Sequence, residues 1–176
     1  RVKPGDKILV SGPVAQHGVA ILSVRQGLEF ETTITSDTQS LHRQVIKLLD
    51  VLGEDVKFLR DPTRGGVATV LNELAAQSGY GVEIIQKDIP VSEQVEGACE
   101  LLGLDPLYVA NEGIFIAVVA EHKANEALSI LKSFHPPTSI IGTVTHEHPK
   151  QVIQHSRIGG RRIVSMLPGE QLPRIC

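Results

Sequence analysis

The sequence predicts an α+β domain in which a mixed β-sheet is layered with helices. Strand and helix patterns follow one another without the strict alternation that a doubly wound parallel sheet requires. Short strand patterns also gather at the end of the domain, which favours a mixed sheet. The chain has 176 residues and is 41% hydrophobic, which is enough for a real core, so wholesale disorder is excluded.

Composition excludes several classes of protein. The net charge is −3, no basic block appears, and two Tyr and four Phe are too few for base stacking, so no nucleic-acid partner is expected. Two Cys cannot form a disulfide scaffold or a four-thiolate zinc site. With no long apolar run and no signal peptide at its start, the chain is expected to be cytoplasmic, without a membrane partner. A start at Arg1 rather than Met suggests a piece of a longer protein, although a processed terminus is the alternative.

The first part of the chain predicts a strand, a helix, a loop and a second helix. The apolar run 7–10 predicts the strand and 17–25 the first helix, whereas 27–39 lacks a sustained period and predicts a loop. Ser40 is the expected N-cap of the second helix and Gly53 its expected stop. The apolar face of that helix is expected to comprise Leu41, Val45, Leu48, Leu49 and Leu52.

A second strand is predicted at 56–59, followed by a Pro- and Gly-rich turn at 61–66. A helix is expected over 67–77, since its apolar residues recur at helical spacing and Gly79 follows. The segment 81–86 predicts the next strand.

Ser92 is expected to open a further helix that buries Cys99. The continuous apolar run 114–120 is typical of a strand covered on both faces, and 121–134 has the pattern of an amphipathic helix. Three short strands are then expected at 139–144, 151–155 and 161–166.

The segment 167–176 contains two Pro and one Gly and has no periodicity, which predicts a flexible tail after a domain spanning 1–166. The tail ends in Cys176. A thiol on an exposed arm can carry a bound group from one site to another, and a frayed end that happens to finish in Cys is the alternative.

A candidate anion site lies in the turn Asp61-Pro-Thr-Arg-Gly-Gly66, between a strand and a helix start. Gly65 and Gly66 allow backbone N–H groups to approach a ligand, and a helix N-terminus favours negative charge. Arg64 can meet a phosphate and Asp61 can help to hold a metal. A simple helix-start turn capped by Asp61 is the alternative.

Glu112, at the mouth of the apolar strand, is a candidate general base, although a solvated loop carboxylate is the simpler reading. His17, at a helix start, can bind a ligand or can simply be a capping or packed histidine. The spacing of His146 and His148 matches no structural zinc pattern, so no metal site is predicted from this chain.

Three segments together resemble the HypE family of hydrogenase maturation factors: 61–68, Asn111-Glu-Gly113 and the ending Leu172-Pro-Arg-Ile-Cys176. The first also resembles the C-terminal domain of the PurM-like (AIR synthase) superfamily, which implies that fold here. The resemblance covers the chain as the C-terminal half of a HypE protein, so the ATP-binding N-terminal domain is absent. The segment 12–18 departs from the Gly-rich family pattern, although His17-Gly18 is present.

The resemblance implies a carbamoyl dehydratase of NiFe hydrogenase assembly. In that family the carbamoyltransferase HypF loads a carbamoyl group onto the terminal cysteine, here Cys176. ATP with Mg²⁺ then drives dehydration to a thiocyanate, and the cyano group passes to iron on a HypC–HypD complex. Glu112 would be the base and Asn111 would orient the amide. Asp61, Arg64, Gly65 and Gly66 would bound the phosphate side, with His17 near the nucleotide.

The resemblance also implies a homodimer for the full-length protein, and little activity for this domain alone. Two other functions stay open: a PurM-like synthetase or kinase acting on a small metabolite, and a non-catalytic docking module whose tail is recognised by a partner.

Overall fold

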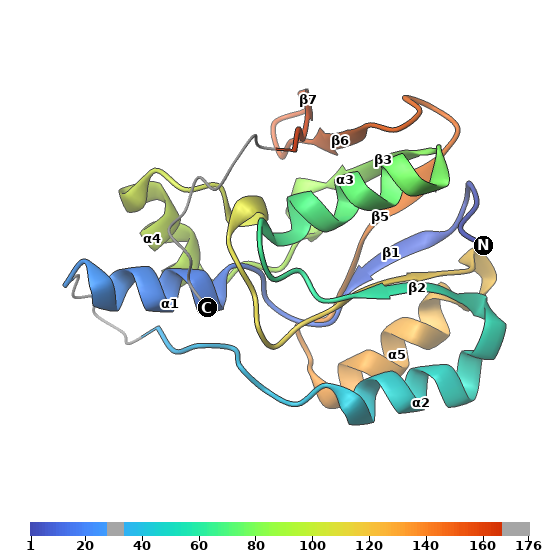
Figure 1. The fold of residues 1–176 in the computed structure, drawn as a ribbon, viewed down its shortest axis with the longest axis horizontal. Helices are drawn as coiled ribbons and strands as arrows, with labels where there is room; N and C mark the ends of the chain where they lie inside the picture. Colours follow the sequence, from blue (N-terminus) through green and yellow to red (C-terminus); the bar gives the residue numbers. More distant parts are fainter. Residues whose placement is uncertain (28–33, 167–176) are drawn as a thin grey trace.

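The computed structural model describes residues 1–27 and 34–166. Its strands are β1 (Lys7–Val10), β2 (Val56–Arg60), β3 (Gly81–Ile85), β4 (Ile116–Val119), β5 (Ser139–Thr145), β6 (Val152–His155) and β7 (Arg161–Ile163). They form one seven-stranded sheet in the order β2-β4-β1-β5-β3-β6-β7 (Figure 1). All neighbouring pairs are antiparallel except β3 and β6, which are parallel.

The five α-helices in the described residues are α1 (Gln16–Arg25), α2 (His42–Leu52), α3 (Gly66–Ser78), α4 (Glu93–Leu102) and α5 (Ala124–Phe134). Short 3₁₀ turns are η1 (Gly53–Asp55), η2 (Gln86–Asp88), η3 (Pro106–Tyr108) and η4 (Glu121–Lys123). A mixed sheet with helices against it confirms the predicted α+β class.

Two hydrophobic clusters lie on opposite faces of the sheet. Because side chains alternate along a strand, Ile8 and Val10 join the cluster that includes α1, α3 and α4, whereas Leu9 joins the one that includes α2 and α5. Figure 1 shows α2 and α5 side by side on the side of the sheet away from α3. Residues 114–120 are all buried, as expected for a strand covered on both faces.

Some helix boundaries follow the predicted signals and others do not: residues 121–123 of the helix predicted over 121–134 form the turn η4, and α5 begins at Ala124. Gly53 ends α2 with φ of 50°, as expected. Ser40 does not cap that helix: Leu41 occupies the N-cap without a side-chain hydrogen bond, and the Ser40 hydroxyl instead contacts Nδ1 of His42 at 2.6 Å. Leu49 is 42% exposed, so its place on the buried face was also wrong.

Within the described residues, no helix is both long and apolar enough to span a membrane. The predicted tail 167–176, and with it Cys176, lies outside the residues that the structure describes.

Candidate functional site

The sheet order brings the predicted site segments together. β1 and β2 both pair antiparallel with β4, and Ile116 is the register partner of both Val10 and Arg60. The carboxyl ends of β1 and β2 therefore flank the amino end of β4. The segments that contain His17, Asp61 and Asn111 consequently meet at one edge of the sheet.

Asn111 joins these three segments. Its side chain is fully buried, and Oδ1 accepts a hydrogen bond from the Ala15 N–H at 2.8 Å. Nδ2 donates to the carbonyl oxygens of Pro62 and Val109, both at 3.0 Å. Because both amide hydrogens are engaged by backbone groups, the geometry favours a positioning role for Asn111 over contact with a substrate.

Close backbone packing explains one of the predicted glycines. Gly66 has φ of +64°, and a Cβ there would lie 2.5 Å from the Leu107 carbonyl oxygen. Gly18 is equally tight, because a Cβ would lie 2.3 Å from Cγ1 of Val109. The segment 107–110 thus packs against the first turns of both α1 and α3. Gly66 is therefore required by the fold, whether or not a ligand approaches it.

The candidate phosphate side is open to solvent. Gly65 occupies the N-cap of α3 with φ of 72°, and no side chain caps this helix, so the alternative in which Asp61 caps it is wrong. Asp61 and Arg64 are exposed, and neither makes a hydrogen bond or ion pair within the described residues. An uncapped helix start beside an unpaired guanidinium fits an anion such as a phosphate.

Glu112 is half-buried, and its carboxylate has no partner within residues 1–27 and 34–166. Its backbone N–H donates to Oδ1 of Asp37 at 3.2 Å. A carboxylate that the fold leaves unpaired is available to accept a proton, as a general base must. Its role in catalysis stays a prediction.

His17 is only 8% exposed, and its Nδ1 lies 2.7 Å from the Ser36 hydroxyl, which in turn contacts the Thr38 hydroxyl at 2.7 Å. The other ring nitrogen, Nε2, is buried and without a hydrogen-bond partner in the described part of the chain. His17 is thus a packed histidine with one polar atom, Nε2, that has no partner in the described part of the chain.

Sequence reasoning missed Asp37. This residue lies in the segment interpreted as a loop, yet it is only 9% exposed and contacts Glu112. The one available signal was the concentration of Ser, Thr and Asp around it, which is typical of side chains that bond to nearby backbone.

Cys99 is 2% exposed on α4, as predicted. Burial raises the pKa of its thiol to about 11, and the negative charges of Asp105 and Glu96 act in the same direction. A thiol held neutral in this way is a poor nucleophile at neutral pH, so Cys99 is unsuited to group transfer.

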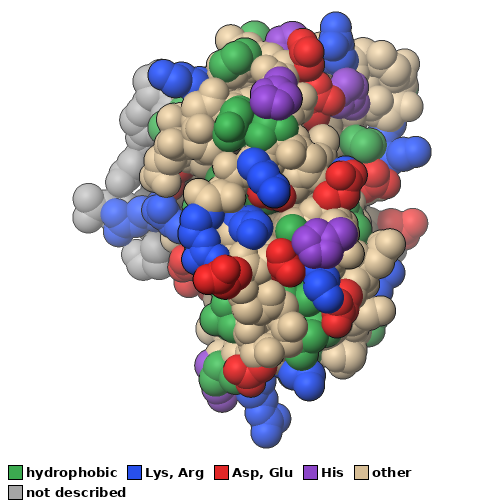
Figure 2. Space-filling model, turned by 90° about the vertical axis from the view of Figure 1, so that its right-hand side faces the viewer, with side chains coloured by type: hydrophobic (Ala, Val, Ile, Leu, Met, Phe, Trp, Pro, Cys, Tyr) green, Lys and Arg blue, Asp and Glu red, His purple; other side chains and the backbone are tan. Residues whose placement is uncertain are grey.

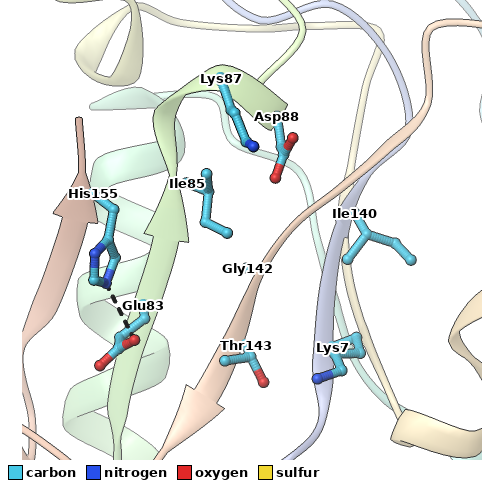
Figure 3. A pocket seen from close by; sticks show the side chains of 9 residues that line it. All are labelled: Lys7, Glu83, Ile85, Lys87, Asp88, Ile140, Gly142, Thr143 and His155. Carbon is cyan, nitrogen blue, oxygen red and sulfur yellow. Dashed lines mark hydrogen bonds and ion pairs between the residues drawn. The ribbon is translucent and has the colours of Figure 1, made fainter. Parts of the chain in front are cut away.

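A cavity of about 550 Å³ lies elsewhere, lined by side chains of β1, β3, β5, β6 and the turn η2 (Figure 3). It is lined by Lys7, Glu83, Ile85, Lys87, Asp88, Ile140, Gly142, Thr143 and His155. Nε2 of His155, on β6, lies 3.2 Å from Oε2 of Glu83, on β3, and Figure 3 marks this contact with a dashed line. None of the predicted site residues lines this cavity.

On the face shown in Figure 2, basic and acidic side chains are interspersed, without a large patch of one charge. Within the described residues, no group of three or more His, Cys, Asp or Glu side chains is placed to hold a metal ion.

Residues 3–154 match the family described as AIR synthase related protein, C-terminal domain, and the chain belongs to this family. Within it, the chain is similar to the carbamoyl dehydratase HypE of Azotobacter vinelandii, with 50% identity over 100% of this chain and 52% of that protein. The chain thus spans about half the length of the curated relatives it matches. The resemblance to HypE proteins is confirmed along the chain.

Solved structures agree. A hydrogenase maturation protein HypE in complex with ATP is 46% identical, with a TM-score of 0.94, and the match covers 100% of this chain and 54% of that one. A HypE–HypF complex matches at 43% identity and a TM-score of 0.89, covering 94% of this chain and 54% of that one. Thiamine monophosphate kinase from Aquifex aeolicus, at 19% identity and a TM-score of 0.57 over 82% of this chain and 49% of that one, shares the fold alone.

Proposed function

We propose that the chain is the C-terminal half of an ATP-dependent carbamoyl dehydratase that makes the cyanide ligand of NiFe hydrogenase. The observation that carries the proposal is the 50% identity to a carbamoyl dehydratase HypE over the whole chain. The likeness to thiamine monophosphate kinase is one of fold, so a metabolite kinase is not favoured.

In this proposal Cys176 carries the carbamoyl group as a thioester-like adduct, S–C(=O)–NH₂. Dehydration removes the carbonyl oxygen and both N–H protons and leaves S–C≡N. Bound ATP would supply the phosphoryl group that turns the carbamoyl oxygen into a leaving phosphate. Glu112 accepts an N–H proton, since its carboxylate is unpaired and its backbone is held by Asp37.

The anion side of the reaction is assigned to Asp61, Arg64, Gly65 and Gly66. The exposed guanidinium and the uncapped start of α3 offer positive charge and N–H donors to the phosphate that forms. Mg²⁺ would then be held mainly by the half of the protein outside this chain, and Asp61 could contribute a carboxylate ligand. His17 would contact the nucleotide through the unpartnered Nε2.

The wider setting is proposed from the relatives. HypF is the expected transferase, because a HypE–HypF complex is known for a similar protein. A HypC–HypD iron scaffold would receive the cyano group in the cytoplasm, and the full-length protein would act as a homodimer. Domain 1–166 with a carrier tail 167–176 is the organisation that suits this cycle.

The test uses the full-length parent protein, treated with carbamoyl phosphate, ATP and the partner transferase. Mass spectrometry of the terminal peptide should show carbamoylated Cys176 and then its ATP-dependent loss of water. An unmodified Cys176 would refute the proposal, whereas loading without dehydration would favour the docking module. Unchanged ATP turnover on a metabolite by Cys176→Ala would favour the kinase alternative.

Glu112→Gln separates loading from dehydration. This variant should accept the carbamoyl group normally but dehydrate it about 10²–10⁴-fold more slowly, which is the usual contribution of a general base. Glu100→Gln, an exposed carboxylate on α4, makes the same chemical change away from the site and serves as the control. Normal dehydration by Glu112→Gln would show that another group is the base.

A further inference from the structure

We infer that Asp37 is a positioning residue that fixes the backbone of Glu112 for proton abstraction. This inference rests on the proposed function, since it assigns a support to the candidate base. Asp37 lies more than 70 positions before Glu112 in the chain, so the contact exists only because the fold creates it.

The first support is the hydrogen bond from the Glu112 N–H to Oδ1 of Asp37, at 3.2 Å. Asp37 is only 9% exposed, and its second oxygen, Oδ2, has no hydrogen-bond partner in the described residues. A buried carboxylate with one unsatisfied oxygen is costly to the fold, and such groups call for a functional explanation.

The second support is the fit of the two backbones. A Cβ on Gly113 would lie 1.6 Å from the carbonyl oxygen of Asp37, so the two chain segments touch directly at this point. Gln39 adds a further tie, because its Nε2 donates to the Gly113 carbonyl oxygen at 2.8 Å. One short segment therefore holds the backbone N–H of Glu112 and the carbonyl of the next residue, Gly113.

The same segment also holds His17, through the Ser36 hydroxyl. Residues 36–39 thus connect the candidate base to the candidate nucleotide contact, although the two come from different ends of the sequence. Loss of the Asp37 contact should therefore leave Glu112 chemically intact but allow it to rotate away from the reacting amide. A displacement of about 1 Å in a reacting group can cost about 100-fold in rate.

The experiment compares Asp37→Ala, Asp37→Asn and Gln39→Ala in the full-length protein, with Asp50→Ala, an exposed aspartate on α2, as the control. The first readout is hydrogen exchange of the Glu112 amide, which needs no catalysis. The others are the single-turnover rate of dehydration, the loading of Cys176 and the KM for ATP.

Asp37→Ala should speed exchange of the Glu112 amide at least tenfold and slow dehydration about 10- to 100-fold, while loading and the KM for ATP change less than twofold. Asp37→Asn keeps an acceptor oxygen and should stay within about threefold of the parent rate. Gln39→Ala, at an exposed position, should slow dehydration several-fold, so the inference remains testable if Asp37→Ala does not fold.

Unchanged exchange of the Glu112 amide in Asp37→Ala would overturn the inference. An equal loss of rate in Asp37→Ala and Asp37→Asn, or a parallel loss of loading, would overturn it as well. If the parent itself does not dehydrate the carbamoyl group, the proposed function fails, and amide exchange still decides whether Asp37 holds Glu112.

Discussion

Replacing Asn111 by alanine should destabilise the chain more than any other single polar substitution at the site. The side chain is fully buried and forms three hydrogen bonds to backbone groups of three different segments. Alanine cannot replace any of them. The substitution therefore removes the link between the starts of α1, α3 and β4 at once.

The magnitude follows from the groups left without partners. Ala15 loses the acceptor for its N–H, and Val109 loses a donor to its carbonyl, whereas the Pro62 carbonyl keeps a hydrogen bond from the Asn111 backbone N–H at 3.1 Å. Each buried unsatisfied group costs about 1–3 kcal/mol, so two of them should lower the free energy of unfolding by about 2–6 kcal/mol. That is a large share of the stability of a typical domain.

Asn111→Asp sharpens the test. The carboxylate keeps an acceptor for the Ala15 N–H but turns the other amide position into an oxygen that faces two carbonyl oxygens. Two acceptors in contact repel, and a buried charge adds a further cost, so this variant should be less stable than Asn111→Ala.

Urea unfolding followed by circular dichroism measures these differences, with Asn125→Ala as the control. Asn125 is exposed on α5, so its replacement should be neutral or slightly stabilising because alanine favours a helix. If Asn111→Ala costs no more than about 1 kcal/mol relative to this control, the bonds are not what holds the segments together. A more stable Asn111→Asp would contradict the reasoning as well.

Three further outcomes are expected. Gly66→Ala should lower the free energy of unfolding by about 3 kcal/mol, because the new Cβ would meet carbonyl oxygens. Gly103→Ala should lower it by only about 1 kcal/mol, because Gly103 has a similar φ of +69° but open space around it. Equal losses in thermal unfolding would refute the steric explanation. Ser92→Ala should lower the free energy of unfolding by about 1 kcal/mol, because α4 loses its N-cap, whereas Ser40→Ala should change it little. If urea unfolding shows a larger loss for Ser40→Ala than for Ser92→Ala, the capping assignment is wrong. Burial raises the pKa of the Cys99 thiol from its ordinary 9.0 to about 11. The neutral buried thiol therefore contributes fully to folding stability below pH 9, and that contribution is lost as the pH rises through 11. Iodoacetamide at pH 8 should label Cys99 only in urea, and labelling at equal rates without urea would contradict its burial.

Features that follow from the local residue pattern could be predicted, whereas those in which a side chain chooses between two nearby hydrogen-bond partners could not. The run 114–120 could be recognised as buried because every residue in it is apolar, although only Ile116–Val119 form the strand β4. Ser40 and Ser92 look alike in sequence, yet only Ser92 caps a helix, accepting a hydrogen bond from the Val95 N–H. The hydroxyl of Ser40 has a competing partner in His42, a choice that local sequence does not reveal.

The site was predictable in its parts but not in its assembly. Asn111 and Glu112 were proposed as site residues from a short motif and a family resemblance, whereas Asp37 was not, because its segment has no periodicity. The contact between Asp37 and Glu112 depends on where their segments lie relative to the sheet, in which β4 pairs with β1 and β2. Such pairing between distant segments is not encoded in any local pattern.

The distribution of hydrogen bonds divides the candidate site into residues that hold backbone segments together and residues that we propose take part in the reaction. The Asn111 side chain is hydrogen-bonded to backbone groups, and backbone carbonyls fill the space beside Gly66, so substitutions at these positions should lower stability and activity together. The Glu112 carboxylate and the Arg64 guanidinium have no partner within the described residues, so changes there should lower activity alone. Asp37 shares features of both groups, because its Oδ1 accepts the Glu112 N–H whereas its Oδ2 has no partner in the described residues. A comparison of stability with dehydration rate across these positions would therefore test whether unsatisfied polar groups, rather than buried ones as such, mark where the chemistry takes place.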